Sequence, residues 1–256
     1  MKAKKRFGQN FLQDRKLLED LISLINISAQ DKFLEIGPGK GDLTENLIYV
    51  CDSYFGIEVD RDLLTFLKDR FPKNKKSFIN GDILKLNPSE IYPSNKFRVV
   101  GNIPYNISSP ILDWCEKNYE KIIDMHFMLQ KEFALRCIGN ERSSSYGKLS
   151  VICKYLYEIT ILKEVTKDFF NPMPKVDSLF LRFSPKKNRL DLKELQNLKI
   201  VTRALFNKKR KKISNSLEDV LLKESINNLD LDLNLRPDEL SLEDYLQISS
   251  LFREDG

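Results

Sequence analysis

Residues 102–105, Asn-Ile-Pro-Tyr, place an amide, a rigid proline and a phenol just after the β-like run Phe97–Val100. The side-chain oxygen of Asn102 and a backbone carbonyl near Ile103-Pro104 are two acceptors that suit the two N–H groups of an exocyclic amine. Proline fixes the backbone and therefore the direction of that carbonyl. The Tyr105 ring offers a face on which an unstacked base can lie. The four residues predict a site for an aminopurine, and a turn with a surface tyrosine is the alternative.

Residues 102–105 also resemble the N-P-P-Y motif of methyltransferases that modify exocyclic amino nitrogens. The lone pair of such a nitrogen is conjugated with the ring, so the amine is a poor nucleophile until two acceptors draw it toward tetrahedral geometry. No carboxylate base is needed, because the nitrogen becomes acidic as its bond to carbon forms. Catalysis by Asn102, Pro104 and Tyr105 would then consist of positioning and electrostatic alignment.

A glycine-rich segment, residues 35–41 (E-I-G-P-G-K-G), continues the β-like run Lys32–Ile36. Glycines allow a sharp turn and a close approach of a ligand to the backbone. The spacing is G-x-G-x-G, which differs from the G-x-G-x-x-G of dinucleotide sites. It resembles the loop of class I methyltransferases, whose ligand, S-adenosyl-L-methionine, has no pyrophosphate. A tight strand-to-helix turn is the alternative.

Acidic residues follow the next two β-like runs. Glu58 comes 21 residues after Gly37 and could accept hydrogen bonds from both hydroxyls of a ribose. Asp82 could accept one from an adenine amino group, or could cap the segment that follows it. Ligands of parallel sheets bind outside the carboxyl ends of the strands. We therefore expect Gly37, Glu58, Asp82 and Asn102 to line one nucleoside site.

Phe170 begins the segment F-N-P-M-P-K, residues 170–175. Two prolines two residues apart exclude a central strand, so the segment is expected to be a loop. Phe170 is predicted to form a second aromatic wall that completes a base sandwich with Tyr105. Phe169 competes for this role, and packing of Phe170 in the interior is the alternative.

The segments that must position these residues alternate between two patterns over residues 1–184. β-like runs are expected at 32–36, 53–57, 77–79, 97–100, 125–129, 159–165 and 178–183, and helices at 42–50, 61–71, 111–118, 131–138 and 149–157. This rhythm predicts an α/β domain with a Rossmann-like, mostly parallel sheet of about seven strands and helices on both faces. Residues 185–256 show helical patterns alone and predict a small all-helical domain.

The charge of the chain is unevenly distributed. The net charge is +5 for 256 residues, but the balance is +5 over residues 1–16, +9 over 185–212 and −8 over 213–256. Basic segments of this kind either meet a polyanion or form a solvated surface, and charge alone does not separate the two.

Several motifs, taken in chain order, resemble one family. They lie at residues 4–12, 35–44, 58, 81–82, 102–108, 145–150, 170–178 and 205–211. Together they are similar to the bacterial small-subunit (16S) ribosomal RNA adenine dimethyltransferases, the KsgA or RsmA type of class I methyltransferase. The resemblance covers nearly all of the chain.

The resemblance implies an enzyme that uses S-adenosyl-L-methionine to dimethylate the N6 amino groups of two adjacent adenosines in the 3′-terminal hairpin of 16S RNA during ribosome biogenesis. It adds Asn10 and Leu12 to the cofactor site, beside Gly37, Glu58, Asp82 and Asn102. Without it, residues 7–12 would be interpreted as a loose arm.

The resemblance also implies that the helical domain and the basic surfaces hold RNA. A basic run follows the amphipathic segment 198–206 and consists of Lys208, Lys209, Arg210, Lys211 and Lys212. We expect this run to contact phosphates, with a solvated helix face as the alternative.

Other classes of protein are less compatible with the sequence. The four cysteines form no C-x-x-C and His126 is the single histidine, so a metal site is not expected. The cysteine pattern also leads us to expect that the protein resides in a reducing cytoplasm. No apolar run approaches the ~20 residues of a membrane helix. We expect a monomer whose partner is 16S RNA within the small subunit (30S or its precursor). A same-fold enzyme acting on large-subunit RNA and a non-catalytic RNA-binding or transcription factor are the alternatives.

Overall fold

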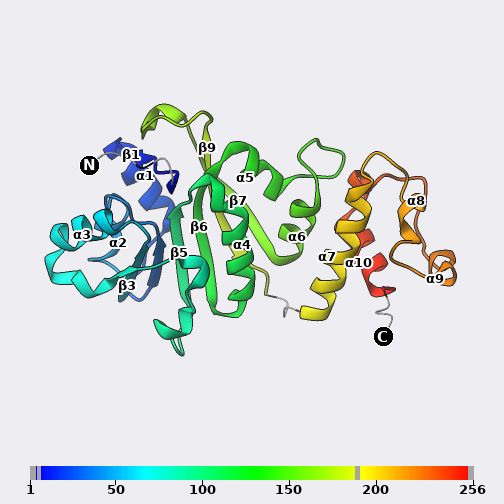
Figure 1. Ribbon diagram of the computed structural model, residues 1–256, viewed down its shortest axis with the longest axis horizontal. Coiled ribbons are helices and arrows are strands. Elements are labelled where there is room, and N and C mark those ends of the chain that lie inside the picture. Colours follow the sequence, from blue (N-terminus) through cyan, green and yellow to red (C-terminus); the bar gives the residue numbers. More distant parts are fainter. Residues whose placement is uncertain (1–3, 5–6, 188–190, 253–256) are drawn as a thin grey trace. The chain divides into compact units, whose positions relative to one another are not determined.

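A seven-stranded sheet organises the computed structural model, which describes residues 4, 7–187 and 191–252. In spatial order its strands are β4 (Phe78–Asn80), β3 (Ser53–Glu58), β2 (Lys32–Ile36), β5 (Phe97–Asn102), β6 (Ile122–Gln130), β9 (Ser178–Pro185) and β7 (Tyr157–Val165). The pairs from β4 to β6 are parallel, and β9 runs antiparallel to β6. The predicted mostly parallel α/β sheet of about seven strands is confirmed (Figure 1).

One helix precedes the first strand of this sheet in the chain, and the others follow its strands. They are α1 (Arg15–Ile25), α2 (Thr44–Leu47), α3 (Arg61–Arg70), α4 (Ser108–Lys117) and α5 (Lys131–Ile138). The helix predicted over 42–50 is reduced to the four residues of α2, because Leu43 offers no capping side chain at its start. The sequence analysis did not predict α1, although Asp14 caps it by accepting from Leu17 N.

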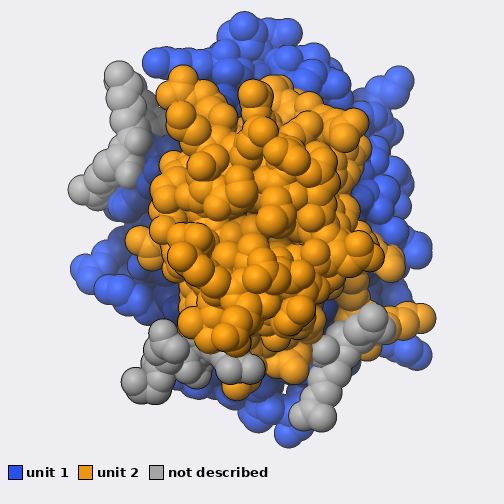
Figure 2. Space-filling view, turned by 90° about the vertical axis from the view of Figure 1, so that its right-hand side faces the viewer, with its two compact units in different colours: residues 1–134, 159–185 blue, residues 135–158, 186–256 orange. Residues whose placement is uncertain are grey.

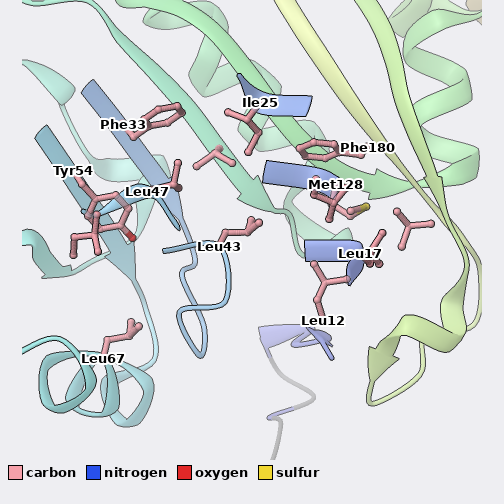
Figure 3. Close-up of a cluster of buried hydrophobic side chains, with 14 of the residues drawn as sticks. Leu12, Leu17, Ile25, Phe33, Leu43, Leu47, Tyr54, Leu67, Met128 and Phe180 are labelled. Carbon is pink, nitrogen blue, oxygen red and sulfur yellow. The ribbon is translucent and has the colours of Figure 1, made fainter. Parts of the chain in front are cut away.

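A hydrophobic core cluster combines α1, the sheet and the loop after β2 (Figure 3). Leu17, Leu21 and Ile25 recur every four residues on α1 and are buried, as expected for one face of an amphipathic helix. They share one cluster with Phe33 of β2 and Met128 of β6. Burial of each large aliphatic side chain contributes about 1.5–3 kcal/mol, so this cluster holds α1 against the sheet.

Gly101 brings the ends of β5 and β2 close together. A Cβ atom at this position would lie 2.8 Å from the Ile36 carbonyl oxygen, so a larger residue would push the strands apart. After the strand ends, Ile103 N donates to the Met128 carbonyl at 3.1 Å. The turn that carries Asn102 is thereby fixed beside the glycine loop.

Arg98 occupies the other end of β5 and is almost fully buried. Its guanidinium donates to both carboxylate oxygens of Asp124 (2.8 and 2.9 Å) and to Asp31 (2.7 Å). It also donates to the carbonyls of Ile25 and Asn26, the last residue and the C-cap of α1. One side chain therefore joins β5, β6, the end of α1 and the start of β2.

The chain divides into two compact units, Met1–Ala134 with Ile159–Pro185, and Leu135–Glu158 with Lys186–Gly256 (Figure 2). The sequence analysis placed residues 135–158 in the predicted first domain, 1–184, whereas in the structure they group with the C-terminal residues. The division into functional domains at residues 184 and 185 stays a prediction.

The second unit is helical and has its own core. Its helices are α6 (Lys148–Leu156), α7 (Leu192–Asn207), α8 (Ser214–Leu217), α9 (Lys223–Asn227) and α10 (Leu242–Ser250). Tyr146 and Tyr245 are fully buried and donate to the carbonyls of Leu240 and Pro237, each at 2.8 Å. Within the residues that the structure describes, no helix is both long and apolar enough to cross a membrane.

Candidate active site

A cavity of about 250 Å³ lies in the first unit, at the carboxyl ends of β2, β3, β4 and β5. This volume is slightly below the ~300–1,000 Å³ that is typical of small-molecule sites. Eight of the residues predicted from the sequence line it: Asn10, Leu12, Gly37, Glu58, Asp82, Asn102, Pro104 and Tyr105. The structure thus brings the predicted cofactor residues and three of the four predicted catalytic residues to one place.

The glycine loop forms the floor of the cavity. Gly37 has a φ of +61°, which favours glycine, and a Cβ atom there would meet no other atom within 4 Å. The space beside the Gly37 backbone is therefore open to a ligand. Gly37 N donates to the Ile57 carbonyl at 2.9 Å, and Gly39 N donates to Glu58 Oε2 at 3.1 Å, so hydrogen bonds tie the loop to β3.

Glu58 is buried at the end of β3, and its second oxygen, Oε1, accepts from Asp60 N at 2.9 Å. Burial raises the pKa of Glu58, and the backbone N–H groups of Asp60 and Gly39 oppose the shift. Each carboxylate oxygen has a further lone pair. Glu58 is therefore a fixed acceptor that can still take hydrogen bonds from ribose hydroxyls.

Asp82 is exposed, and its Oδ1 accepts from Leu84 N at 3.0 Å, which caps a short 3-10 helix over Ile83–Lys85. The capping role left open by the sequence is therefore present. No described residue donates to the second oxygen, Oδ2, and Asp82 lines the cavity. Capping and acceptance of an amino group are compatible.

Asn102 is held by its amide nitrogen, which donates to the Asn10 carbonyl at 2.8 Å. This bond fixes the amide and leaves Oδ1 as an acceptor to which no described residue donates. The Pro104 carbonyl accepts from Ile107 N at 3.0 Å, so the Ile103 carbonyl is the neighbouring acceptor that the described residues leave available. The turn can therefore present two acceptors to one amine.

The two predicted aromatic walls have different environments. Tyr105 is half-buried and lines the cavity; burial raises the pKa of its hydroxyl, and the Ser178 hydroxyl opposes the shift. Phe170 lies outside the described lining, because its strand β8 (Phe170–Asn171) pairs with β1 (Phe11–Leu12) and its ring is buried in the core. The structure therefore places Phe170 in the core and not in the described lining, and its role as a second aromatic wall stays a prediction.

Sequence analysis missed Glu35, which is buried within β2 and also lines the cavity. Its Oε2 accepts from the hydroxyls of Thr44 (2.7 Å) and Tyr54 (2.5 Å). Burial raises the pKa of Glu35 to about 7, and these two hydrogen bonds oppose the shift. The available signal was an acidic residue at position 35 between the apolar residues Leu34 and Ile36.

The predicted RNA-contacting run lies in the second unit, and several of its side chains are already engaged there. Lys208 Nζ lies 2.7 Å from Asp219, Lys209 Nζ donates to the Tyr146 carbonyl at 3.2 Å, and Lys212 Nζ donates to Asn234 at 2.8 Å. In the described structure, the side chains of Arg210 and Lys211 have no such partner. These two cations are therefore the most available for phosphate.

The cavity lining suits the cofactor that the resemblance implies. Four carboxylic acids, those of Glu35, Asp42, Glu58 and Asp82, contribute to the lining, whereas its described residues include no lysine, arginine or histidine. Such a lining favours a cationic ligand and disfavours a pyrophosphate. S-adenosyl-L-methionine carries a positive sulfonium and an ammonium, so the residues present fit it.

Comparisons with known proteins agree with this geometry. A family model described as "Ribosomal RNA adenine dimethylase" matches residues 1–254. "Ribosomal RNA small subunit methyltransferase A" of Coxiella burnetii is 38% identical over 253 residues, 98% of each chain. The protein of the same name from Wigglesworthia glossinidia brevipalpis is 37% identical over 250 residues, 96% of each chain.

Two solved structures are similar over most of their length. A dimethyladenosine transferase from Plasmodium falciparum has a TM-score of 0.76 at 25% identity, covering 93% of this chain and 95% of that chain. The 23S rRNA methyltransferase ErmE has a TM-score of 0.72 at 25% identity, covering 94% and 99%. The family match, the relatives of equal length and the lining of the cavity lead to one conclusion: the chain belongs to the ribosomal RNA adenine dimethylase family of class I, S-adenosyl-L-methionine-dependent methyltransferases.

Proposed function

We propose that this enzyme dimethylates the N6 amino groups of two adjacent adenosines in the 3′-terminal hairpin of 16S RNA during small-subunit biogenesis. The observation that carries the proposal is the turn after β5: the free Oδ1 of Asn102 and the Ile103 carbonyl lie at the same cavity as Gly37 and Glu58. The names of the curated relatives at 37–38% identity support the small subunit as the target.

Different residues would bind the cofactor, position the target amine and support the target base. Glu58 and Asp82 would hold the ribose and the adenine of S-adenosyl-L-methionine, which supplies an electrophilic methyl group on a cationic sulfur. Asn102 Oδ1 and the Ile103 carbonyl would accept hydrogen bonds from the two N6–H groups and turn the nitrogen lone pair toward that methyl group. The Tyr105 ring would support the flipped base.

A second candidate is methylation of large-subunit RNA, favoured by the similarity to the 23S rRNA methyltransferase ErmE. We also propose that the enzyme is a cytoplasmic monomer that acts on the 30S subunit or its precursor. Arg210 and Lys211 are proposed to contact the RNA backbone. Light scattering coupled to size exclusion would test the monomer directly.

Incubation with a methyl-labelled cofactor and undermethylated small subunits would test the target. We expect label on two adjacent adenosines near the 3′ end of 16S RNA, with none on large subunits handled in the same way. The variant Asn102→Ala serves as the inactive control. Label on 23S RNA, or absence of label on both RNAs from a protein that binds the cofactor, would contradict the proposed target.

A further inference from the structure

The amino-terminal arm, defined here as Lys4 together with residues 7–12, forms one wall of the cavity through its residues 7–12. Its last two residues form β1, which pairs with β8. Its middle is held by the bond from Asn102 Nδ2 to the Asn10 carbonyl (2.8 Å). The catalytic amide therefore depends on the arm for its orientation.

The start of the arm is fastened to Asp60, the residue that caps α3. Lys4 Nζ lies 2.6 Å from Asp60 Oδ1, and Gln9 Nε2 donates to Asp60 Oδ2 at 3.0 Å. Lys4 and Gln9 are also joined, since Lys4 N donates to Gln9 Oε1 at 2.8 Å. Both oxygens of one carboxylate are thus occupied by the arm.

Asp60 also contacts a residue of the cofactor site. Its backbone N–H donates to Glu58 Oε1 at 2.9 Å, although Asp60 itself is not among the residues that line the cavity. The Asp60 side chain is 3% exposed. Burial alone would raise the pKa of Asp60, but the hydrogen bonds from Lys4 and Gln9 outweigh it and leave that pKa lowered. The carboxylate is held ionised for its cationic partner.

We infer that Asp60 is a positioning residue: through Lys4 and Gln9 it holds the amino-terminal arm over the cofactor, so that arm docking and cofactor binding are coupled. The inference rests on the cofactor of the proposed function but not on its RNA target. Coupling between two events is reciprocal. Loosening the arm lowers cofactor affinity, and cofactor binding protects the arm.

The simpler role for Asp60 is to cap α3, since its Oδ1 accepts from Asp62 N at 3.1 Å. The variant Asp60→Asn separates the two roles, because asparagine caps helices as well as aspartate does but carries no charge for Lys4. Asp62→Asn is the matched control. Asp62 also contacts Lys4 at 2.6 Å, but its side chain is 67% exposed, where such pairs contribute little.

Two measurements without RNA test the inference. Calorimetric titration gives the affinity for S-adenosyl-L-methionine, and hydrogen–deuterium exchange of the backbone amides of residues 7–12 reports arm opening with and without the cofactor. We expect Asp60→Asn to weaken cofactor binding about tenfold, the value of one charge-assisted hydrogen bond. The cofactor should slow this exchange in the wild type and in Asp62→Asn, and much less in Asp60→Asn.

A double-mutant cycle with Lys4→Met shows whether the arm transmits the effect. We expect Asp60→Asn to change affinity little once Lys4 is absent, because the two substitutions break the same contact. Unchanged affinity and protection in Asp60→Asn, or additive losses in the cycle, would overturn the inference. A wild-type protein that fails to bind the cofactor would instead refute the proposed function.

Discussion

Replacement of Asn102 by alanine (Asn102→Ala) should separate methyl transfer from cofactor binding. The substitution removes Oδ1, which we assign to the target amine, and also Nδ2, which donates to the Asn10 carbonyl at 2.8 Å. The first loss acts on the reacting nitrogen, and the second acts on the arm that lines the cavity. The two losses should therefore appear in different measurements.

The geometry gives a magnitude for each loss. Removal of one oriented hydrogen-bonding group from a transition state costs about 2.7–4 kcal/mol, a factor of about 10²–10³ in rate. Loss of the neutral bond to Asn10 costs about 0.5–1.5 kcal/mol, so affinity for the cofactor should fall by no more than about tenfold. Because Asn102 is only half-buried, water can hydrate the freed carbonyl, which keeps this second loss small.

Single-turnover transfer of labelled methyl groups to small subunits measures the first loss, and calorimetry on the free protein measures the second. Asn106→Ala is the control, since Asn106 is exposed in the same turn and lines the same cavity. We expect near-normal transfer from this control. The reasoning would be refuted by normal turnover in Asn102→Ala, or by a loss that lies wholly in cofactor affinity.

Three further changes test other parts of the structure. Glu58→Ala should weaken cofactor binding by about 10²-fold, because it removes the buried acceptor assigned to the two ribose hydroxyls; calorimetry measures this. Replacement of both Arg210 and Lys211 by glutamine should reduce the slope of log K against log salt for RNA binding by about 1.8, that is, about 0.9 for each lost phosphate contact. Burial lowers the pKa of His126 from its ordinary 6.5 to about 4, so the unfolded chain takes up the proton first as pH falls. The histidine should therefore cost about 2 kcal/mol of stability between pH 7 and pH 5, and His126→Leu should remove that loss in urea unfolding.

Each of these changes has a control. Asp82→Ala should lower cofactor affinity less than Glu58→Ala, because Asp82 is exposed, and equal losses would contradict the ribose assignment. Replacement of Lys208 and Lys212 by glutamine should change the salt slope less, because both side chains are engaged within the second unit. An identical pH dependence of unfolding in the wild type and in His126→Leu would show that the histidine is not kept neutral.

The strand ends of the site were predictable because their signals are local. Each of these β-like runs is followed by residues that mark the carboxyl end of a parallel strand. The first run is followed by glycines, the second by Glu58 and the third by Asp82. Asn102 was predictable for the same reason. The position of Asn10 was predicted only through the family resemblance and not from a local pattern, because the arm is held by partners 50 or more residues away, such as Asp60 and Asn102.

The buried position of Phe170 shows what local sequence patterns cannot predict. Its neighbouring prolines identify a loop, but its burial follows from the pairing of Leu12 with Phe170, residues 158 positions apart. The same limit applies to residues 135–158, whose grouping with the C-terminal helices depends on contacts that no single segment encodes. Long-range packing, rather than propensity, decides these features.

The ion pairs of Arg98 limit which substitutions the sequence can accept during evolution. A substitution at Arg98 would leave two half-buried carboxylates without their cation, and a substitution at Asp31 or Asp124 would leave the guanidinium short of counter-charge. Breaking such a cluster from either side costs about 3–5 kcal/mol, a large part of the stability of a domain. Lineages of this protein can therefore change the three positions only together. Covariation among them is expected even though they lie at the far end of β5 from the chemistry.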